Sequence, residues 1–179
     1  MADTAETAAQ LLLKVKGNVL PKKGLSNGLV QRFCKLACSS DFKGVYSADY
    51  LPPKLPALSN FIVVVNLGVR KGVRYKLPAG HFVTIYATPA RIYYVDPYGI
   101  PSVEPHVNQF LERCGRPVVC NLRQIQDFGS VYCGLYAVLF ACYVDKRPNF
   151  RLLFERRRLL ENDKLCLDYL QKLFNYHRG

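Results

Sequence analysis

The chain has 179 residues, with 25 Lys and Arg against 13 Asp and Glu, so its formal net charge at pH 7 is +12. Half of the residues are hydrophobic, 12% are aromatic and 21% are charged, which excludes a disordered or collagen-like chain and suits one compact domain. Residues 1–10 lack the pattern of a secretory signal, and no apolar run approaches the roughly 20 residues that span a bilayer, so we expect no secretion and no membrane contact.

The N-terminal part of the chain predicts helices. Apolar residues at 11–15 indicate a helix that Pro21 and Gly24 interrupt, and a second short helix follows at 29–38. We interpret residues 1–40 as an N-terminal helical arm of a single domain that spans residues 1–179, an arm that the sequence allows to cover the functional site. Prolines at 52, 53 and 56 then predict an irregular crossing.

Strand and helix signals follow in the rest of the chain. Segments 61–65, 81–86, 91–95 and 117–122 are rich in β-branched and aromatic residues and predict strands. Between the last two segments a helix is expected, with Ser102 as its N-terminal cap and Gly115 just past its end. Its apolar residues recur at helical spacing: Val103, Val107, Phe110, Leu111 and Cys114.

Two further helices complete the expected fold. Residues 133–144 are apolar on every side, which is typical of a helix buried inside a domain. An amphipathic helix is expected at 163–176, with its inward face formed by Leu167, Leu170, Leu173 and Phe174. The predicted fold is therefore α+β, a mainly antiparallel sheet with helices on both sides.

The excess positive charge is concentrated in three places. The stretches between Glu6 and Asp41 and between Asp49 and Asp96 contain no acid and six Lys or Arg each, and a third cluster is formed by Arg151 and residues 156–158. Such surfaces attract polyanions, so nucleic acid is an expected partner. Ordinary solvated faces explain the same composition equally well.

Seven cysteines, at 34, 38, 114, 120, 133, 142 and 166, form no C-x-x-C pair, so a structural zinc site is not expected. Their number and spacing favour a reducing compartment with mostly buried thiols. One of them is a candidate nucleophile.

Three histidines are the candidates for a general base at neutral pH: His81, His106 and His177. If Thr88 and Pro89 form the centre of a hairpin turn, His81 faces Asp96 across the two strands, near enough for an imidazole N–H to reach the carboxylate. The other interpretation is a surface ion pair that contributes little.

Cys133 is the best-placed thiol, because it follows a loop and begins the buried helix. The free N–H groups and dipole of a helix N-terminus favour the thiolate, which is the reactive form, and Gly134 allows another segment to approach closely. Acyl transfer also needs a donor to the oxyanion. Gln126, at the end of the preceding strand, and Gln124, on the same strand face, both qualify on spacing.

Four features follow one another along the chain: His81, Asp96 in the run Tyr-Val-Asp-Pro-Tyr-Gly, Gln126, and the run Cys-Gly-Leu-Tyr from Cys133. In this order the sequence resembles the adenovirus protease (adenain) family, which are cysteine peptidases related to the SUMO-specific proteases. The interval of seven from Gln126 to Cys133 matches the viral branch and favours Gln126 over Gln124. Residues 41–46 also resemble the stretch before the histidine of the viral enzymes, so the likeness covers residues 40 to 145. Two departures are Phe82, where the family has Trp, and Asp96, where the viral enzymes have Glu.

The resemblance implies a papain-like, adenain-like fold and a cysteine endopeptidase with the catalytic residues His81, Asp96, Gln126 and Cys133. It implies cleavage of viral capsid and core precursors at Gly-Gly or Gly-x-Gly sites during virion maturation, by a monomer in the host nucleus and the virion. Neither a metal nor an organic cofactor is expected, while DNA and a short viral peptide are candidate activators. In the family that peptide can be disulfide-linked to a cysteine. No cysteine here falls at the spacing expected for that link, and Cys114 and Cys120 are the nearest.

Two other functions fit the sequence. An isopeptidase of the deubiquitinase or deSUMOylase type would remove a folded ubiquitin-like modifier rather than cut a short Gly-Gly peptide. A basic nucleic-acid-binding module with a vestigial site would instead bind DNA tightly and in a salt-sensitive way.

Overall fold

The computed structural model describes residues 24–53, 55, 59–68, 80–144 and 158–176. In chain order they form α2 (Asn27–Ala37), β1 (Phe42–Ser47), the 3-10 turn η1 (Ala48–Tyr50), β2 (Phe61–Asn66), β3 (Phe82–Ala87), β4 (Ile92–Val95), α3 (Pro105–Arg113), β5 (Val118–Cys120), α4 (Cys133–Tyr143) and α5 (Leu159–Tyr176). The fold is α+β. The helix expected at 11–15 lies outside the described residues, as do His177 and most of all three basic clusters.

The five strands form one mixed sheet in the order β1-β2-β3-β4-β5. The two central pairings are antiparallel, while β1 with β2 and β4 with β5 are parallel. The prediction of a mainly antiparallel sheet is therefore wrong at both edges. The cause at one edge is α3, which crosses between β4 and β5 and lets the chain enter β5 in the direction of β4.

Strands β2, β3 and β4 confirm three of the predicted segments to within one residue. Strand β1 was not predicted, because Gly44 at φ 147° and a register shift between Phe42 and Gly44 break its alternating pattern. The fourth predicted strand is shorter than expected, since the chain leaves the sheet after Cys120.

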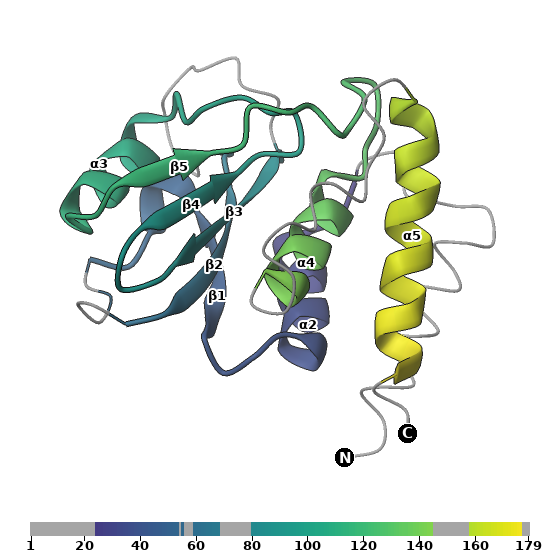
Figure 1. Ribbon diagram of the computed structural model, residues 1–179, viewed down its shortest axis with the longest axis horizontal. Helices are drawn as coiled ribbons and strands as arrows, with labels where there is room; N and C mark the ends of the chain where they lie inside the picture. The colour runs from purple at the N-terminus through teal and green to yellow at the C-terminus, as the bar shows by residue number, and fades with distance from the viewer. Residues whose placement is uncertain (1–23, 54, 56–58, 69–79, 145–157, 177–179) are drawn as a thin grey trace.

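Helices cover both faces of the sheet, as predicted (Figure 1). On one side α2, α4 and α5 form a cluster with Ile62 and Val64 of β2, and on the other side Val107 and Phe110 of α3 pack on the alternate face of the same strand. Strand β2 is thus buried on both faces, and each of its apolar side chains contributes about 1.5–3 kcal/mol of burial free energy.

The helix boundaries follow local capping. Helix α2 begins after Ser26, whose hydroxyl accepts from the Leu29 N–H at 3.3 Å, and its buried side chains belong to the core. The predicted cap of α3 at Ser102 is wrong. Glu104 caps it instead and accepts from the Val107 N–H at 2.8 Å, because Pro105 occupies the first turn, where its missing N–H is no loss.

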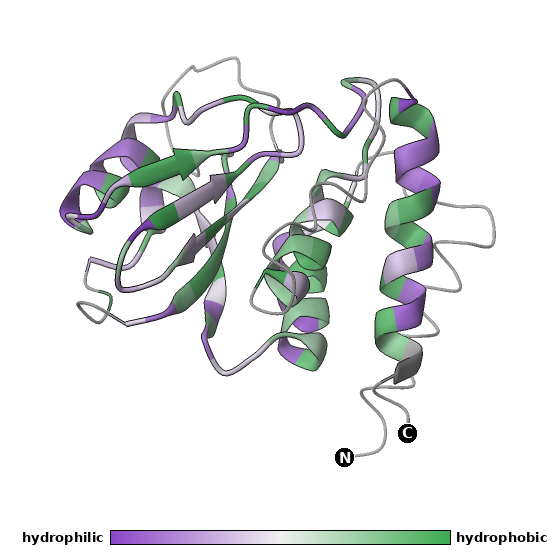
Figure 2. Ribbon diagram, viewed as in Figure 1, coloured by the Kyte–Doolittle hydropathy of each residue, from purple (hydrophilic) through white to green (hydrophobic). Residues whose placement is uncertain are grey.

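Helix α4 is buried almost throughout, as its apolar sequence predicts, and Figure 2 shows it largely in the hydrophobic colour. Gly134 allows α4 to pack closely on Leu25 and on Val30 of α2, since a Cβ there would lie 3.1 Å from a Leu25 carbon and 3.2 Å from a Val30 carbon. Helix α5 starts earlier than expected, and its four predicted inward residues, Leu167, Leu170, Leu173 and Phe174, are all buried.

The turn after β4 packs on the chain that leads to α4. Gly99 has φ +70°, and a Cβ on it would lie 2.6 Å from the backbone carbon of Arg123 and from the backbone nitrogen of Gln124. Beside this contact, the N–H groups of Ile125 and Gln126 both donate to the Pro97 carbonyl at 3.0 Å. The turn and the 121–126 segment are therefore held together by close backbone contacts.

We expect Gly99→Ala to destabilise the fold by about 2–5 kcal/mol, the sum of left-handed strain and overpacking against backbone atoms. Gly115→Ala is the matched control. Its φ is +63° and nothing lies within 4 Å of the added Cβ, so only the strain of about 1–2 kcal/mol applies. Urea unfolding of both variants measures the difference, and equal losses would contradict the close approach.

Candidate active site

Cys133 is the first residue of α4, as predicted, and the helix is capped by no side chain at its N-terminus. The thiol is 9% exposed, and its Sγ lies 3.6 Å from the carbonyl oxygen of Gly80, the residue before His81. The first N–H groups of a helix have no intrahelical acceptor and can donate to a negatively charged group. The nucleophile candidate therefore lies beside both a histidine and a set of backbone donors.

His81 and Asp96 form a buried pair, each with a side chain 5% exposed. The Nε2–H of His81 donates to Asp96 Oδ1 at 2.8 Å, so the neutral imidazole has its lone pair on Nδ1. Nδ1 is buried and forms no hydrogen bond. The predicted pairing of these two residues is correct, and it is not a surface ion pair.

The hairpin register behind this pair differs from the prediction. Thr84 pairs with Val95 and Tyr86 with Tyr93, because the turn is closed by the Thr88 N–H donating to the Arg91 carbonyl. Extended past the last bridge, this register places Tyr98 opposite His81 and makes Asp96 its diagonal neighbour. A shift of two residues keeps every side chain on its face, so the His81–Asp96 contact survives the error.

Tyr98 is the site residue that sequence reasoning missed. Its ring stacks on the His81 imidazole with centroids 4.2 Å apart and an interplanar angle of 5°, and it also contacts Phe128 at 4.9 Å. Phe82, which stands where the family has Trp, is fully buried in the core instead. Tyr98 thus supplies the aromatic packing of the imidazole, and the corrected hairpin register would have indicated it.

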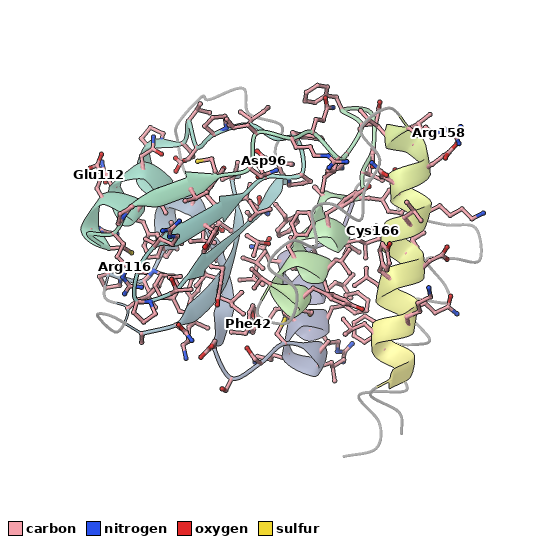
Figure 3. All side chains as sticks on the ribbon, in the orientation of Figure 1. Phe42, Asp96, Glu112, Arg116, Arg158 and Cys166 are labelled. Carbon is pink, nitrogen blue, oxygen red and sulfur yellow. The ribbon has the colours of Figure 1, made fainter. Side chains whose placement is uncertain are left out.

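Asp96 is fixed from two sides. Asn121, just past β5, accepts from the Asp96 N–H and donates to the Asp96 carbonyl, both at 2.8 Å. The Tyr98 N–H donates to Asp96 Oδ1 at 2.7 Å. The carboxylate therefore faces the imidazole without freedom to rotate away, and Figure 3 shows Asp96 just beyond the end of β4.

Burial alone would lower the pKa of His81. The hydrogen bond to Asp96, the neighbouring Cys133 sulfur and the negative charges of both outweigh it and raise this pKa from 6.5 to about 9. At neutral pH the imidazole is consequently protonated. Burial, followed by the charges of Cys133 and Asp96, also raises the pKa of Tyr98 to about 12.

Gln126 is fully buried, but it lies in an irregular segment and not at the end of a strand. Its Nε2 donates to the Ser130 carbonyl at 3.0 Å and to Ser130 Oγ at 3.3 Å, while its Oε1 has no partner. Gln124 is more exposed and donates to the Gln126 carbonyl at 2.9 Å. The structure thus joins Gln126 to the loop before Cys133, whereas Gln124 only supports its backbone.

The C-terminal helix supports the same segment. Asn162, fully buried, donates to the Ile125 carbonyl at 2.9 Å, and Asp163 accepts from the Tyr136 hydroxyl at 3.0 Å. Burial raises the pKa of Asp163, an effect that hydrogen bonds from Ser130 and Tyr136 oppose. Ser130 is therefore shared between Gln126 and Asp163.

A mainly apolar pocket of about 170 Å³ opens beside the imidazole. His81, Asp96 and Tyr98 contribute to its wall, and the apolar remainder includes Val103 and Phe128, which are 62% and 64% exposed. Exposed apolar side chains around a histidine are suited to holding an apolar group of a ligand.

The described residues contain no group of three or more His, Cys, Asp or Glu arranged to hold a metal ion. None of their helices is long and apolar enough to cross a membrane. His106 lies in the first turn of α3, and its Nδ1 is 2.8 Å from Glu104 Oε1. Because α3 and α4 pack on opposite faces of the sheet, His106 belongs to the N-terminal cap of α3 and not to the site around Cys133.

Comparison with known proteins gives little. No family model matches the sequence, and no curated protein matches it. Among solved structures, the chain is similar to a deletion variant of AvrA with IP6 and CoA, at 11% sequence identity and a TM-score of 0.45. The match covers 88% of this chain and 66% of that one, so the chain spans just under two thirds of its length. The site is therefore interpreted from its own geometry.

The raised pKa of His81 predicts a pH-dependent stability. The charged imidazole stabilises the folded state by about 3 kcal/mol below pH 6.5, and this contribution is lost as the pH rises from 6.5 through about 9. Urea unfolding of the wild type at pH 6 and pH 9.5 measures the loss. In His81→Gln the difference between the two pH values should shrink by that amount, and an unchanged difference would contradict the assignment.

Proposed function

We propose that the protein is a cysteine endopeptidase in which Cys133, His81 and Asp96 act as nucleophile, proton carrier and orienting acid. One observation carries the proposal. The buried imidazole donates to Asp96 from Nε2 and leaves Nδ1 without a partner, on a histidine whose pKa is raised by the Cys133 sulfur. These contacts support nucleophilic catalysis by a thiol, which uses an imidazole held by an acid beside the nucleophile.

The chemistry follows from where the proton lies. Because His81 is protonated at neutral pH, Cys133 would attack a peptide carbonyl as a thiolate, forming the S–C bond and placing the negative charge on the carbonyl oxygen. The imidazolium would give its proton to the leaving amine as the C–N bond breaks. His81, now neutral, would take a proton from water as the water attacks the thioester. The S–C bond then breaks, the carboxylic acid product leaves, and the thiolate and the protonated imidazole are restored.

The oxyanion would be bound by the Cys133 N–H and by the Gln126 amide. Gln126 reaches this role only if its Nε2 exchanges one of its hydrogen bonds to Ser130 for one to the substrate oxygen, since both of those bonds go to Ser130 in the structure. Such a donor accounts for on the order of 10²-fold or more in rate. Asp163 and Asn162 would act indirectly, because their hydrogen bonds hold the segment that carries Gln126.

The resemblance to the adenain family extends the proposal to substrates and setting. It supports viral capsid and core precursors cut at Gly-containing sites, in the host nucleus and the virion, by a monomer stimulated by DNA or a viral peptide. The pocket beside His81 would take an apolar side chain of such a substrate, because Val103 and Phe128 present apolar surface there.

Cleavage of a peptide with Leu-x-Gly-Gly before the scissile bond tests the proposal, with and without added DNA. Cys133→Ala should abolish cleavage, since no other thiol lies beside His81. Cys114→Ala is the matched control, because that half-buried thiol belongs to the α3 face of the sheet and should leave the rate unchanged.

Three outcomes separate the functions that fit the sequence. Peptide cleavage that depends on Cys133 supports the endopeptidase. Cleavage of a folded ubiquitin-like conjugate in strong preference to the peptide would indicate an isopeptidase. Tight, salt-sensitive DNA binding without either activity would leave a nucleic-acid-binding module as the better account.

Tyr98 is expected to position the imidazole through its ring. Tyr98→Ala should lower kcat/KM by about 2- to 10-fold, the equivalent of a lost aromatic contact, while Tyr98→Phe keeps the stacking surface and should retain the wild-type rate. Peptide kinetics over pH 6–10 check this, since a loosened imidazole should also shift the alkaline limb. Equal losses in both variants would assign the effect to the hydroxyl instead.

A further inference from the structure

We propose that a peroxide oxidises Cys38 and Cys142 to a disulfide bond, and that this bond links α2 to α4. The two residues are 104 positions apart in the chain, and their Sγ atoms lie 2.9 Å apart as thiols. A disulfide bond of about 2.05 Å therefore needs the sulfur atoms to approach by only about 0.9 Å. This proposal is independent of the proposed peptidase activity.

The pair joins the same ends of two parallel helices. At the N-terminal end, Gly134 of α4 packs against Leu25 and Val30, and at the C-terminal end Cys142 of α4 meets Cys38, the residue that caps α2. Both helices belong to the main core cluster, which holds their backbones in place. The bond would thus form without moving either helix, at the end of α4 opposite to Cys133.

Exposure decides which sulfur reacts first. Cys38 is half-buried, whereas Cys142 and Cys34 are 1% and 0% exposed. The Cys38 thiolate would attack the peroxide, whose O–O bond breaks to leave a sulfenic acid on Cys38 and one water. Cys142 would then attack the sulfenic sulfur, forming the S–S bond and releasing the oxygen as a second water. One peroxide gains two electrons and the two thiols lose them.

Cys34 is the competing partner, since it also contacts Cys38. Burial, together with a hydrogen bond to Cys38 and its charge, raises the pKa of Cys34 well above its usual range. Cys34 also sits four residues before Cys38, one turn up the same helix, where a bond would tie α2 only to itself. The interhelical pair is therefore the one we assign.

Tryptic peptides distinguish the possibilities, because Lys35 separates Cys34 (peptide 33–35) from Cys38 (peptide 36–43). Cys142 lies in peptide 124–146, which also contains Cys133, so the full chain is tested both as wild type and as Cys133→Ala. After treatment with hydrogen peroxide and alkylation of remaining thiols, non-reducing mass spectrometry should show peptide 36–43 joined to 124–146 in both proteins, with the mass of two hydrogens lost.

Stability supplies the second readout. The closed loop spans about a hundred residues, so oxidation should raise Tm by roughly 5 to 15 °C, reversed by dithiothreitol. Cys38→Ala should lose both the crosslink and the shift, whereas Cys166→Ala, a buried thiol of α5, should keep both. A crosslink between 33–35 and 36–43, an accumulated sulfinic acid on Cys38, or a crosslink without a rise in Tm would overturn the proposal.

Discussion

The Pro97 carbonyl oxygen accepts hydrogen bonds from the N–H groups of both Ile125 and Gln126. This contact holds the turn that carries Asp96 and Tyr98 against the segment that carries Gln126. On one side of Pro97 is Asp96, whose carboxylate orients His81, and on the other is Tyr98, whose ring covers the imidazole. The acid, the aromatic cover and the amide donor are thus all held by one turn, and their relative positions are set by backbone geometry.

Electrostatics in the site depend on how the imidazole is buried. A histidine in an apolar core would lose its proton, but here the cost of burial is offset by Asp96 on one side and Cys133 on the other. The backbone N–H and carbonyl of Asp96 are both hydrogen-bonded to the Asn121 side chain. The carboxylate oxygen Oδ1 of Asp96 accepts from His81 and from the Tyr98 N–H. Nδ1 of His81 and Oε1 of Gln126 are two buried atoms of this site that form no hydrogen bond.

The sequence predicted the parts of this site that depend on period and composition. Alternation placed His81 and Asp96 on one face, and the uniformly apolar run placed Cys133 at the start of a buried helix. The register failed because the turn closes through Thr88 and Arg91, and local sequence does not distinguish turns two residues apart. The role of Tyr98 was hidden by this error, and the edge strand β1 by a glycine bulge. The partners of Gln126 depend on an irregular segment with no period to interpret.

That irregular segment explains why α5 is part of the site although it contributes no reacting group. Residues 121–132 belong to no helix or strand, so their backbone groups find partners one by one, some in backbone carbonyls such as that of Pro97 and others in side chains from α5. Ile125 finds Asn162, and Ser130 finds both Asp163 and Gln126. Since Gln126 would have to leave Ser130 to reach an oxyanion, Asp163 keeps a hydrogen bond to Ser130 when that happens. The loop before Cys133 would therefore stay in place while its amide donor moves.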